Sequence, residues 1–316
     1  MSSNQQPPQT TKPHGQHEHH DHDNFDWGAM GEKIELEGEV LAGFVHDAAR
    51  KITELFAGGP VHTIIDVGSG PGVGSCILAE AFPQATVTAI DASESLLVRA
   101  QARAERMGLT ARLLTQVGNL GPGMVSSTSV DLVWASMMLH HVHDQEAALG
   151  AIRGSLRVGG WLAIAEFGAP LACIPSTELD AYADVLDRCQ AAVWDWLPDQ
   201  LPDGPAAPGR THSGSHSGPH SASQAALQAA LERTGFSRVE HTTLTVEIPA
   251  PLDASARGYV VQSFARLREI VATRLDGADI ARLDELLDPN NPRGLPTRAD
   301  LFVRAGRTLT TAQAVA

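Results

Sequence analysis

The chain has 316 residues, of which 43% are hydrophobic and 19% are charged, and its formal net charge is −14. These values are typical of a globular protein with one large domain, or with one domain and a substantial insertion. Nucleic acids and anionic membrane surfaces are bound mainly through Lys and Arg, so the acidic balance argues against both as partners.

The first 26 residues are expected to form a disordered, His-rich tail. Residues 1–26 are polar, and residues 14–22 contain five histidines. Such a tract can bind Zn²⁺ or Ni²⁺, but a solvated tail is the simpler interpretation, and we expect no metal site. The tail lacks the basic start and apolar run of a secretory signal, and the three cysteines show no CxxC spacing. We therefore expect a cytoplasmic protein without a transmembrane segment, either monomeric or homodimeric.

Helix and strand patterns alternate between residues 30 and 167. A single helix is predicted over residues 30–57, because Leu41, Val45 and Ala48 lie on one apolar stripe. Strands are predicted over residues 61–67, 85–90, 112–117, 130–135 and 161–167, alternating with helices over residues 72–82, 93–107 and 144–156. This alternation predicts a doubly wound α/β sheet with parallel strands and helices on both faces.

The pattern is less regular after residue 168. Residues 198–224 are rich in Pro, Gly, Ser and His, which predicts a mobile loop. Strands are predicted over residues 239–248 and 299–305, and inserted helices are predicted between them in residues 255–290. Residues 169–316 are therefore expected to complete the sheet.

A glycine-rich turn follows the first predicted strand. From Asp66 onward the sequence reads Asp-Val-Gly-Ser-Gly-Pro-Gly, with glycines at Gly68, Gly70 and Gly72. Glycine permits the positive φ of a tight turn and lets the backbone approach a ligand closely. A nicotinamide-dependent oxidoreductase is the alternative interpretation, but a dinucleotide site prefers GxGxxG, and Val73 in place of the last glycine counts against it.

The pattern Asp-x-Gly-x-Gly-x-Gly resembles motif I of the class I S-adenosylmethionine-dependent methyltransferases. Residues 131–142 (DLVWASMMLHHV) and 156–167 (LRVGGWLAIAEF) resemble the fourth-strand and fifth-strand motifs of the same family. The resemblance covers residues 61–168 and is nearest to the broad small-molecule group. It implies S-adenosylmethionine as the cofactor.

The resemblance also implies which residues hold the cofactor. Asp91 ends the second predicted strand, where a carboxylate accepts hydrogen bonds from the ribose hydroxyls; capping of the next helix is its other interpretation. Asn119 stands where these enzymes often carry an acidic residue that reaches the adenine amino group, and its side-chain oxygen can also accept that bond. The expected cofactor-binding residues are Asp66, Gly68, Ser69, Gly70, Gly72, Asp91, Ala92, Asn119, Leu120 and Ser136.

The fold of this family implies a Rossmann-like sheet of seven strands, with the last strand antiparallel and inserted beside the fifth. Residues 61–168 would then form the S-adenosylmethionine-binding core, and residues 169–316 the C-terminal half of the sheet. Family members often cover the active site with helices. Residues 27–60 and 255–290 are therefore expected to form a lid over the substrate.

Histidines after the fourth predicted strand are candidates for acid–base chemistry. Ligands of open α/β sheets bind at the carboxyl ends of the strands, where His140, His141 and His143 lie. His140 and His141 are expected to be catalytic, because histidine titrates near neutral pH, although such residues also hydrogen-bond loops. Glu166, at the end of the fifth strand, is a further catalytic candidate. Trp27, His141 and His143 are expected to contact the substrate.

The expected acceptor is a small organic molecule, such as a secondary metabolite. Methyltransferases of nucleobase or glutamine amino groups typically carry an Asn/Asp-Pro-Pro-aromatic run after the fourth strand, whereas this chain carries Ala135-Ser136-Met137-Met138. Methyl transfer from a sulfonium is an in-line displacement, which needs positioning and, for a hydroxyl acceptor, a base. A non-catalytic protein that binds S-adenosylmethionine or a metal is the third interpretation.

Overall fold

Seven strands form one mixed sheet in the computed structural model, which describes residues 30–121, 129–142, 144–175, 182–200 and 219–316. The strands are β1 (Thr63–Val67), β2 (Thr86–Asp91), β3 (Leu113–Val117), β4 (Val130–Ser136), β5 (Leu156–Phe167), β6 (Phe236–Ile248) and β7 (Val303–Ala314). Their order in the sheet is β3-β2-β1-β4-β5-β7-β6. Strands β1 to β5 pair in parallel, whereas β7 is antiparallel to both β5 and β6.

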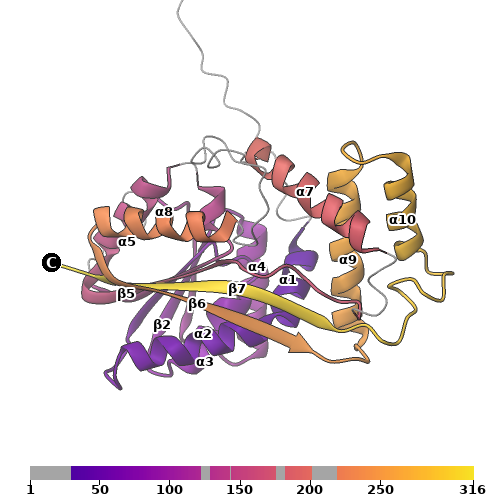
Figure 1. Ribbon diagram of the computed structural model, residues 1–316. Helices are drawn as coiled ribbons and strands as arrows, with labels where there is room; N and C mark the ends of the chain where they lie inside the picture. Colours follow the sequence, from indigo (N-terminus) through magenta and orange to yellow (C-terminus); the bar gives the residue numbers. More distant parts are fainter. Residues whose placement is uncertain (1–29, 122–128, 143, 176–181, 201–218) are drawn as a thin grey trace, which may run out of the picture.

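Helices cover both faces of this sheet. They are α1 (Gly31–Val40), α2 (Ala42–Leu55), α3 (Val73–Ala81), α4 (Glu94–Arg106), α5 (Gln145–Ser155), α7 (Ala183–Gln200), α8 (Pro219–Arg233), α9 (Ala254–Val271) and α10 (Gly277–Leu287), with a short 3-10 helix, η2, at Leu139–His141. Helices α5 and α8 lie on one face, and α2 and α3 lie on the opposite face (Figure 1). The predicted doubly wound α/β architecture is confirmed.

Successive residues of the central strands supply two hydrophobic cores. Ile64 in β1 and Leu132 in β4 are buried among residues of α2 and α3, whereas their neighbours Ile65 and Val133 are buried among residues of α5 and α8. Side chains alternate across a strand, so a strand that is covered on both faces needs an unbroken apolar run. Strand β1 carries Ile64-Ile65 before the buried Asp66, and β4 carries the apolar residues 132–135 after the buried Asp131, and these short runs are the pattern from which both strands are predicted.

The prediction of one continuous helix over residues 30–57 is wrong. The helix is interrupted at Leu41 (φ −94°, ψ 11°), which separates α1 from α2. Both helices contact α3, but α2 packs its apolar stripe on the sheet, whereas α1 also contacts α9 and α4. Two different packing partners therefore require two helix directions, and the apolar period of the sequence does not report such a change.

The predicted place of the seventh strand is confirmed, but its predicted bounds are wrong. Strand β7 lies antiparallel between β5 and β6, as the family resemblance implies. It begins at Val303 and ends at Ala314, whereas the sequence predicts residues 299–305. Thr308 and Thr310 are buried within β7, and such buried polar residues interrupt the hydrophobic pattern from which a strand is predicted.

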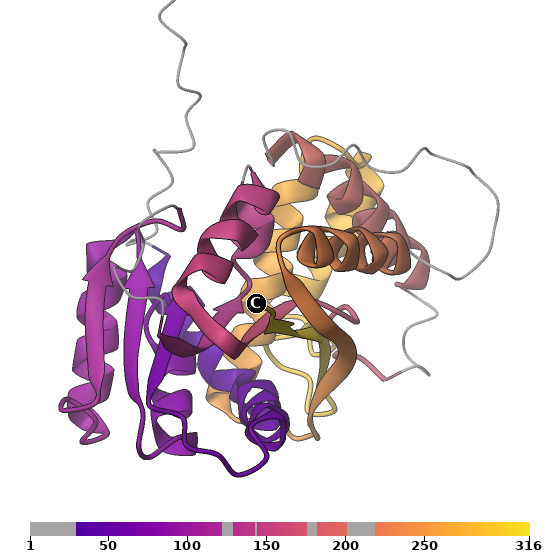
Figure 2. The ribbon, with the colours of Figure 1, turned by 90° about the vertical axis from the view of Figure 1, so that its left-hand side faces the viewer.

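Helices also gather beyond one end of the sheet. Figure 1 shows α7, α9 and α10 at the end toward which the β6 arrow points, and α1 contacts α9 there. Figure 2 shows the strands of the first half of the chain on the left and β6 and β7 on the right, as the strand order requires. None of the helices in the described ranges is long and apolar enough to cross a membrane. The predicted tail, residues 1–26, lies outside the described residues, as do residues 201–218 of the predicted loop.

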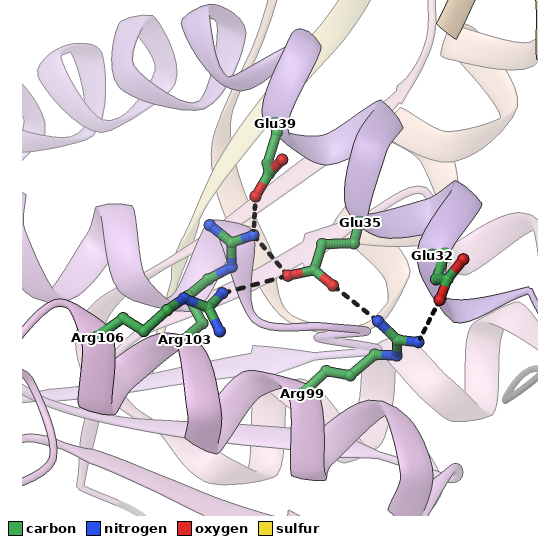
Figure 3. Close-up of polar contacts among 6 residues, drawn as sticks. All are labelled: Glu32, Glu35, Glu39, Arg99, Arg103 and Arg106. Atoms are coloured by element: carbon green, nitrogen blue, oxygen red, sulfur yellow. Dashed lines mark hydrogen bonds and ion pairs between the residues drawn. The ribbon is translucent and has the colours of Figure 1, made fainter. Parts of the chain in front are cut away.

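An ion-pair cluster joins α1 to α4. Its members are Glu32, Glu35 and Glu39 of α1 with Arg99, Arg103 and Arg106 of α4 (Figure 3). Glu35 accepts hydrogen bonds from Arg99 (3.0 Å) and Arg103 (2.8 Å). The side chains of Glu35 and Arg103 are only 17% and 11% exposed, so solvent ions screen this pair weakly. The cluster therefore fixes α1 to the parallel part of the sheet.

Glu35→Gln is expected to destabilise the protein by about 1–3 kcal/mol, because the substitution removes a negative charge that neutralises the largely buried guanidinium of Arg103. Thermal unfolding measures this change. Glu247→Gln is the matched control, since it removes an exposed pair with Arg304 and should change stability by less than about 0.5 kcal/mol. Equal effects of the two variants would contradict the role given to the cluster.

Candidate active site

A cavity of about 560 Å³ opens at the carboxyl ends of the central strands. The segments that follow β1, β2, β3 and β4 supply much of its lining, and α1 adds Ile34, Glu37 and Gly38. Strand β1 has β2 on one side and β4 on the other, so the cavity lies where the chain switches direction across the sheet. Open α/β sheets bind their ligands at this switch point.

The glycine turn lies against this cavity. Gly68, Gly70 and Gly72 have φ values of 66°, 53° and 77°, a region that other residues rarely adopt. The N–H groups of Gly68 and Ser69 donate to the carbonyl oxygen of Ile90 (2.8 and 3.0 Å), which anchors the turn to β2. The buried Ser69 hydroxyl has no hydrogen-bond partner among the described residues. A bound ligand can supply that partner.

Asp91 ends β2 and lines the cavity. Its Oδ2 accepts a hydrogen bond from the Gly70 N–H (2.8 Å), and its Oδ1 accepts one from the N–H of Ser93 (2.9 Å), the N-cap residue of α4. An ionised carboxylate offers about four lone-pair sites, so both oxygens retain acceptor capacity. Capping and ligand binding, the two interpretations from the sequence, are therefore compatible.

Asp66, near the end of β1, is buried and hydrogen-bonded to a residue of α3. Its Oδ2 accepts a hydrogen bond from the Ser75 hydroxyl (2.6 Å), and the residue is only 2% exposed. Burial raises the pKa of Asp66 to about 7, opposed by the Ser75 hydrogen bond and assisted by the nearby charge of Asp91. Asp66 is therefore partly protonated near neutral pH.

Asp66→Asn is expected to make the ligand-free protein more stable relative to wild type, and this gain should be larger at alkaline pH than at acidic pH. The folded-state pKa of Asp66, about 7, lies above the ordinary value of 3.8. The contribution of the Asp66 carboxyl to the stability of the folded protein is therefore complete below about pH 4. It is lost as the pH rises through 7, because this carboxyl ionises more readily in the unfolded chain than in the folded protein. Asn cannot ionise and can still accept the Ser75 hydrogen bond.

The melting temperature of Asp66→Asn relative to wild type should rise by roughly 2–6 °C between about pH 5 and about pH 8. Measuring the difference between variant and wild type removes the contribution of the other titrating groups. A difference that stays constant across this interval would contradict the raised pKa.

His140 and Glu166 form a hydrogen-bonded pair at the cavity. His140 lies in η2, directly after β4, and Glu166 lies in β5, the neighbour of β4. Nδ1 of His140 is 2.7 Å from Oε2 of Glu166, whose Oε1 accepts the N–H of Leu139 (2.8 Å). Because an ionised carboxylate only accepts, Nδ1 carries the proton, and Nε2 of a neutral imidazole keeps its lone pair. Glu166 thereby orients both the loop and the ring.

His141 differs from His140 in its electrostatics. The two ring centroids are 4.1 Å apart, and His141 lines the cavity with part of its side chain exposed. Desolvation and the adjacent His140 lower the pKa of His141 to about 4, with Glu166 acting in the opposite direction. His141 is therefore neutral at physiological pH, able to form hydrogen bonds but a weak proton acceptor.

The cavity gathers most of the site residues predicted from the sequence. Its lining includes Asp66, Gly68, Ser69, Gly70, Asp91, Ala92, Asn119, Leu120, Ser136, His140 and His141. Gly72 is not part of this lining: a Cβ there would lie 2.6 Å from the Cβ of Ala100, so Gly72 permits close packing against α4. Glu166 does not line the cavity itself, but it is hydrogen-bonded to His140, which does. Trp27 and His143 lie outside the described residues.

Glu37, Arg307 and Met137 are among the further residues that line the cavity and that were not predicted as site residues from the sequence. Nη2 of Arg307 donates to Oε1 of Glu37 (2.8 Å), and these residues are 270 positions apart in the chain. Such a pairing leaves no local pattern; the available signal is a charged residue, Arg307, within the largely buried β7. Met137 lines the cavity with a φ of 53°, which is strained for a non-glycine residue and is typical of functional loops.

Comparisons with known proteins identify the class of this domain. Residues 65–164 match a family model described as a methyltransferase domain. A malonyl-[acyl-carrier protein] O-methyltransferase of Laribacter hongkongensis is 31% identical over 110 residues, which cover 33% of this chain and 37% of that protein. A trans-aconitate 2-methyltransferase of Methylobacterium radiotolerans is 31% identical over 124 residues, covering 38% of this chain and 45% of that protein. The chain thus matches less than half the length of each of these relatives.

A solved structure of phosphoethanolamine N-methyltransferase 2 of Haemonchus contortus, in complex with S-adenosyl-L-methionine, is 15% identical to this chain. The two align with a TM-score of 0.44 over 84% of this chain and 52% of that one.

The family match contains most of the residues that line the cavity. Residues 65–164 contain the glycine turn, Asp91 and η2. They form a class I S-adenosylmethionine-dependent methyltransferase domain, and the cofactor of this domain is S-adenosylmethionine. For this domain, residues 65–164, the predicted family, enzyme class and cofactor are confirmed.

Proposed function

We propose that the whole chain transfers a methyl group from S-adenosylmethionine to a hydroxyl oxygen of a small organic molecule. One observation carries this proposal: the same cavity is lined by the glycine turn and Asp91 and by His140, which is paired with Glu166. A cofactor subsite and a proton acceptor therefore share one space, as methylation of a hydroxyl requires.

The described residues fit the cofactor. The turn presents backbone of positive φ to the cavity, the buried Ser69 hydroxyl lacks a partner among the described residues, and Asp91 retains acceptor capacity. We assign Asp91 to the ribose hydroxyls and Asn119 to the adenine amino group. When bound, the cofactor supplies a methyl group that its sulfonium has already activated.

His140 is the proposed base. Glu166 holds the Nδ1 proton, so Nε2 can accept the proton that the acceptor hydroxyl loses during transfer. The carboxylate of Glu166 then stabilises the imidazolium that forms. His141 accepts protons poorly, since its pKa is lowered to about 4, and we assign it to contact with the acceptor.

Helices α1, α9 and α10 are proposed to cover the acceptor, as parts of the lid segments 27–60 and 255–290. Helix α1 lines the cavity and contacts α9, and α9 in turn contacts α10. A covered site excludes water, which strengthens the electrostatic interactions within it. Trans-aconitate, for which one relative is named, is a small organic molecule, and this supports the proposed size of the acceptor.

An acceptor screen tests the proposed function. The purified protein is incubated with radiolabelled S-adenosylmethionine and a panel of phenols, alcohols, hydroxy acids and amines, and labelled products are identified by mass spectrometry. We expect O-methyl products from at least one hydroxyl compound. Binding of the cofactor without turnover of any panel member would favour a non-catalytic S-adenosylmethionine-binding protein.

A further inference from the structure

A second cavity, of about 360 Å³, adjoins the first. It lies between α1, α9, the segment that follows β5, and β7. Ile34, Glu37 and Arg307 line both cavities, so the ion pair of Glu37 with Arg307 stands between them. Phe167 lines the second cavity, and its ring centroid is 4.8 Å from that of His140. The second cavity therefore borders both the cofactor space and the proposed base.

This second cavity is basic, although the chain as a whole is acidic. Its lining includes Lys33, Arg266 and Arg307, against one carboxylate, that of Glu37, while Glu269, which lies outside the lining, pairs with Arg266 (3.3 Å). Tyr259 adds no negative charge, because burial and the nearby Glu37 raise its pKa to about 12. A local excess of positive charge in a chain of net charge −14 favours an anionic ligand at this place.

The guanidinium of Arg307 has unused hydrogen-bonding capacity. Its side chain is 12% exposed; Nη2 donates to Glu37 and Nη1 to the carbonyl oxygen of Gly306 (3.2 Å). The buried Nε of Arg307 has no hydrogen-bond partner among the described residues. A buried donor without an acceptor is unfavourable, and a guanidinium binds carboxylates and phosphates through two parallel N–H groups.

We propose that the second cavity is the acceptor subsite and that Arg307 binds an anionic group, a carboxylate or a phosphate, of the methyl acceptor. This inference rests on the proposed function and narrows its substrate class to hydroxyl compounds that carry an acidic group away from the reacting oxygen. The apolar lining, which includes Phe167, Pro170 and Leu171, suits the carbon skeleton between the two groups. Glu37 competes with the acidic group of the ligand for Arg307.

Matched acids and amides test this inference. The probes are 4-hydroxybenzoate, 4-hydroxyphenylacetate and 3-hydroxybutyrate, each with its primary amide, together with 4-hydroxybenzyl phosphate and 4-hydroxybenzyl alcohol. Each probe is titrated by calorimetry into the protein saturated with S-adenosylhomocysteine. We expect at least one anion to bind about tenfold or more tightly than its neutral counterpart, because only the anion forms charge-assisted hydrogen bonds. The carboxylate and phosphate arms show which anion the subsite takes.

Two variants should change this preference in opposite directions. Arg307→Gln should abolish it, whereas Glu37→Gln should strengthen binding of the anion by about threefold or more, because Arg307 loses its internal competitor. Arg304→Gln is the matched control. It removes the same charge from β7, but Arg304 pairs with the exposed Glu247 and lines neither cavity, so the preference should persist.

The affinity for S-adenosylhomocysteine is measured separately on every protein. If the wild type fails to bind it, the proposed function fails, and this inference fails with it. If the wild type and the variants bind it alike, the cofactor site is intact and the outcome concerns the acceptor subsite alone. Equal binding of anions and neutral counterparts, weaker binding of the anion by Glu37→Gln, or loss of the preference in Arg304→Gln would then overturn the inference.

Discussion

His140→Ala is expected to lower the turnover number by roughly 10²–10⁴-fold, while the affinity for S-adenosylhomocysteine stays within about threefold of wild type. The substitution removes the proton acceptor that Glu166 orients through a 2.7 Å hydrogen bond, and it leaves the glycine turn and Asp91 in place. The measurement is single-turnover kinetics with the acceptor that the screen identifies, combined with calorimetry of cofactor binding.

Two further variants sharpen this prediction. Glu166→Gln keeps an acceptor oxygen near His140 but removes the charge that stabilises the imidazolium, so we expect an intermediate loss of roughly tenfold or more. His46→Ala removes an exposed histidine of α2 that does not line the cavity, and it should leave turnover unchanged. A loss of less than about threefold in His140→Ala would contradict the base role and indicate an acceptor, such as a carboxylate, that needs no deprotonation.

Asp91→Ala is expected to weaken binding of S-adenosylmethionine and S-adenosylhomocysteine by roughly 10- to 100-fold. A hydrogen bond to a charged group contributes about 1.5–3 kcal/mol, and the ribose offers two hydroxyls. The substitution also releases the N–H groups of Gly70 and Ser93, which loosens the turn and the start of α4. Calorimetric titration measures the change in affinity.

Glu94→Ala is the matched control for Asp91→Ala. Glu94 is an exposed acidic residue three positions further along, in the first turn of α4, and it does not line the cavity. Its removal should change cofactor affinity by less than about twofold. If Asp91 only capped α4, Asp91→Ala would lower the melting temperature and leave the affinity unchanged, and this result would contradict its assignment to the ribose.

The part of the first cavity that the glycine turn and Asp91 line could be predicted from the sequence, because these residues directly follow strands. A central strand is predicted from a short apolar run, such as Ile64-Ile65. The residues that follow such a strand must lie at the carboxyl edge of the sheet. The glycine turn and Asp91 are each fixed in this way by a few neighbouring residues. Gly72 differs from its neighbours in the turn: it packs against Ala100 of α4 and does not line the cavity, and this long-range contact has no local pattern in the sequence.

The second cavity and the placement of α1 could not be predicted because they depend on contacts between distant parts of the chain. Arg307 meets Glu37 across 270 positions, and Glu35 meets Arg103 across 68 positions. The break at Leu41 follows from where α1 and α2 pack, and the apolar stripe of the sequence continues through it. Long-range pairing of charged residues has no period and no motif, so it becomes visible only in the folded structure.

Calorimetric titration of the wild-type protein with S-adenosylmethionine, S-adenosylhomocysteine and NADH is the most direct test of the methyltransferase assignment. We expect both adenosyl ligands to bind with dissociation constants on the order of micromolar, and NADH not to bind. Binding of NADH without binding of either adenosyl ligand would contradict the assignment and identify the glycine turn as a dinucleotide site.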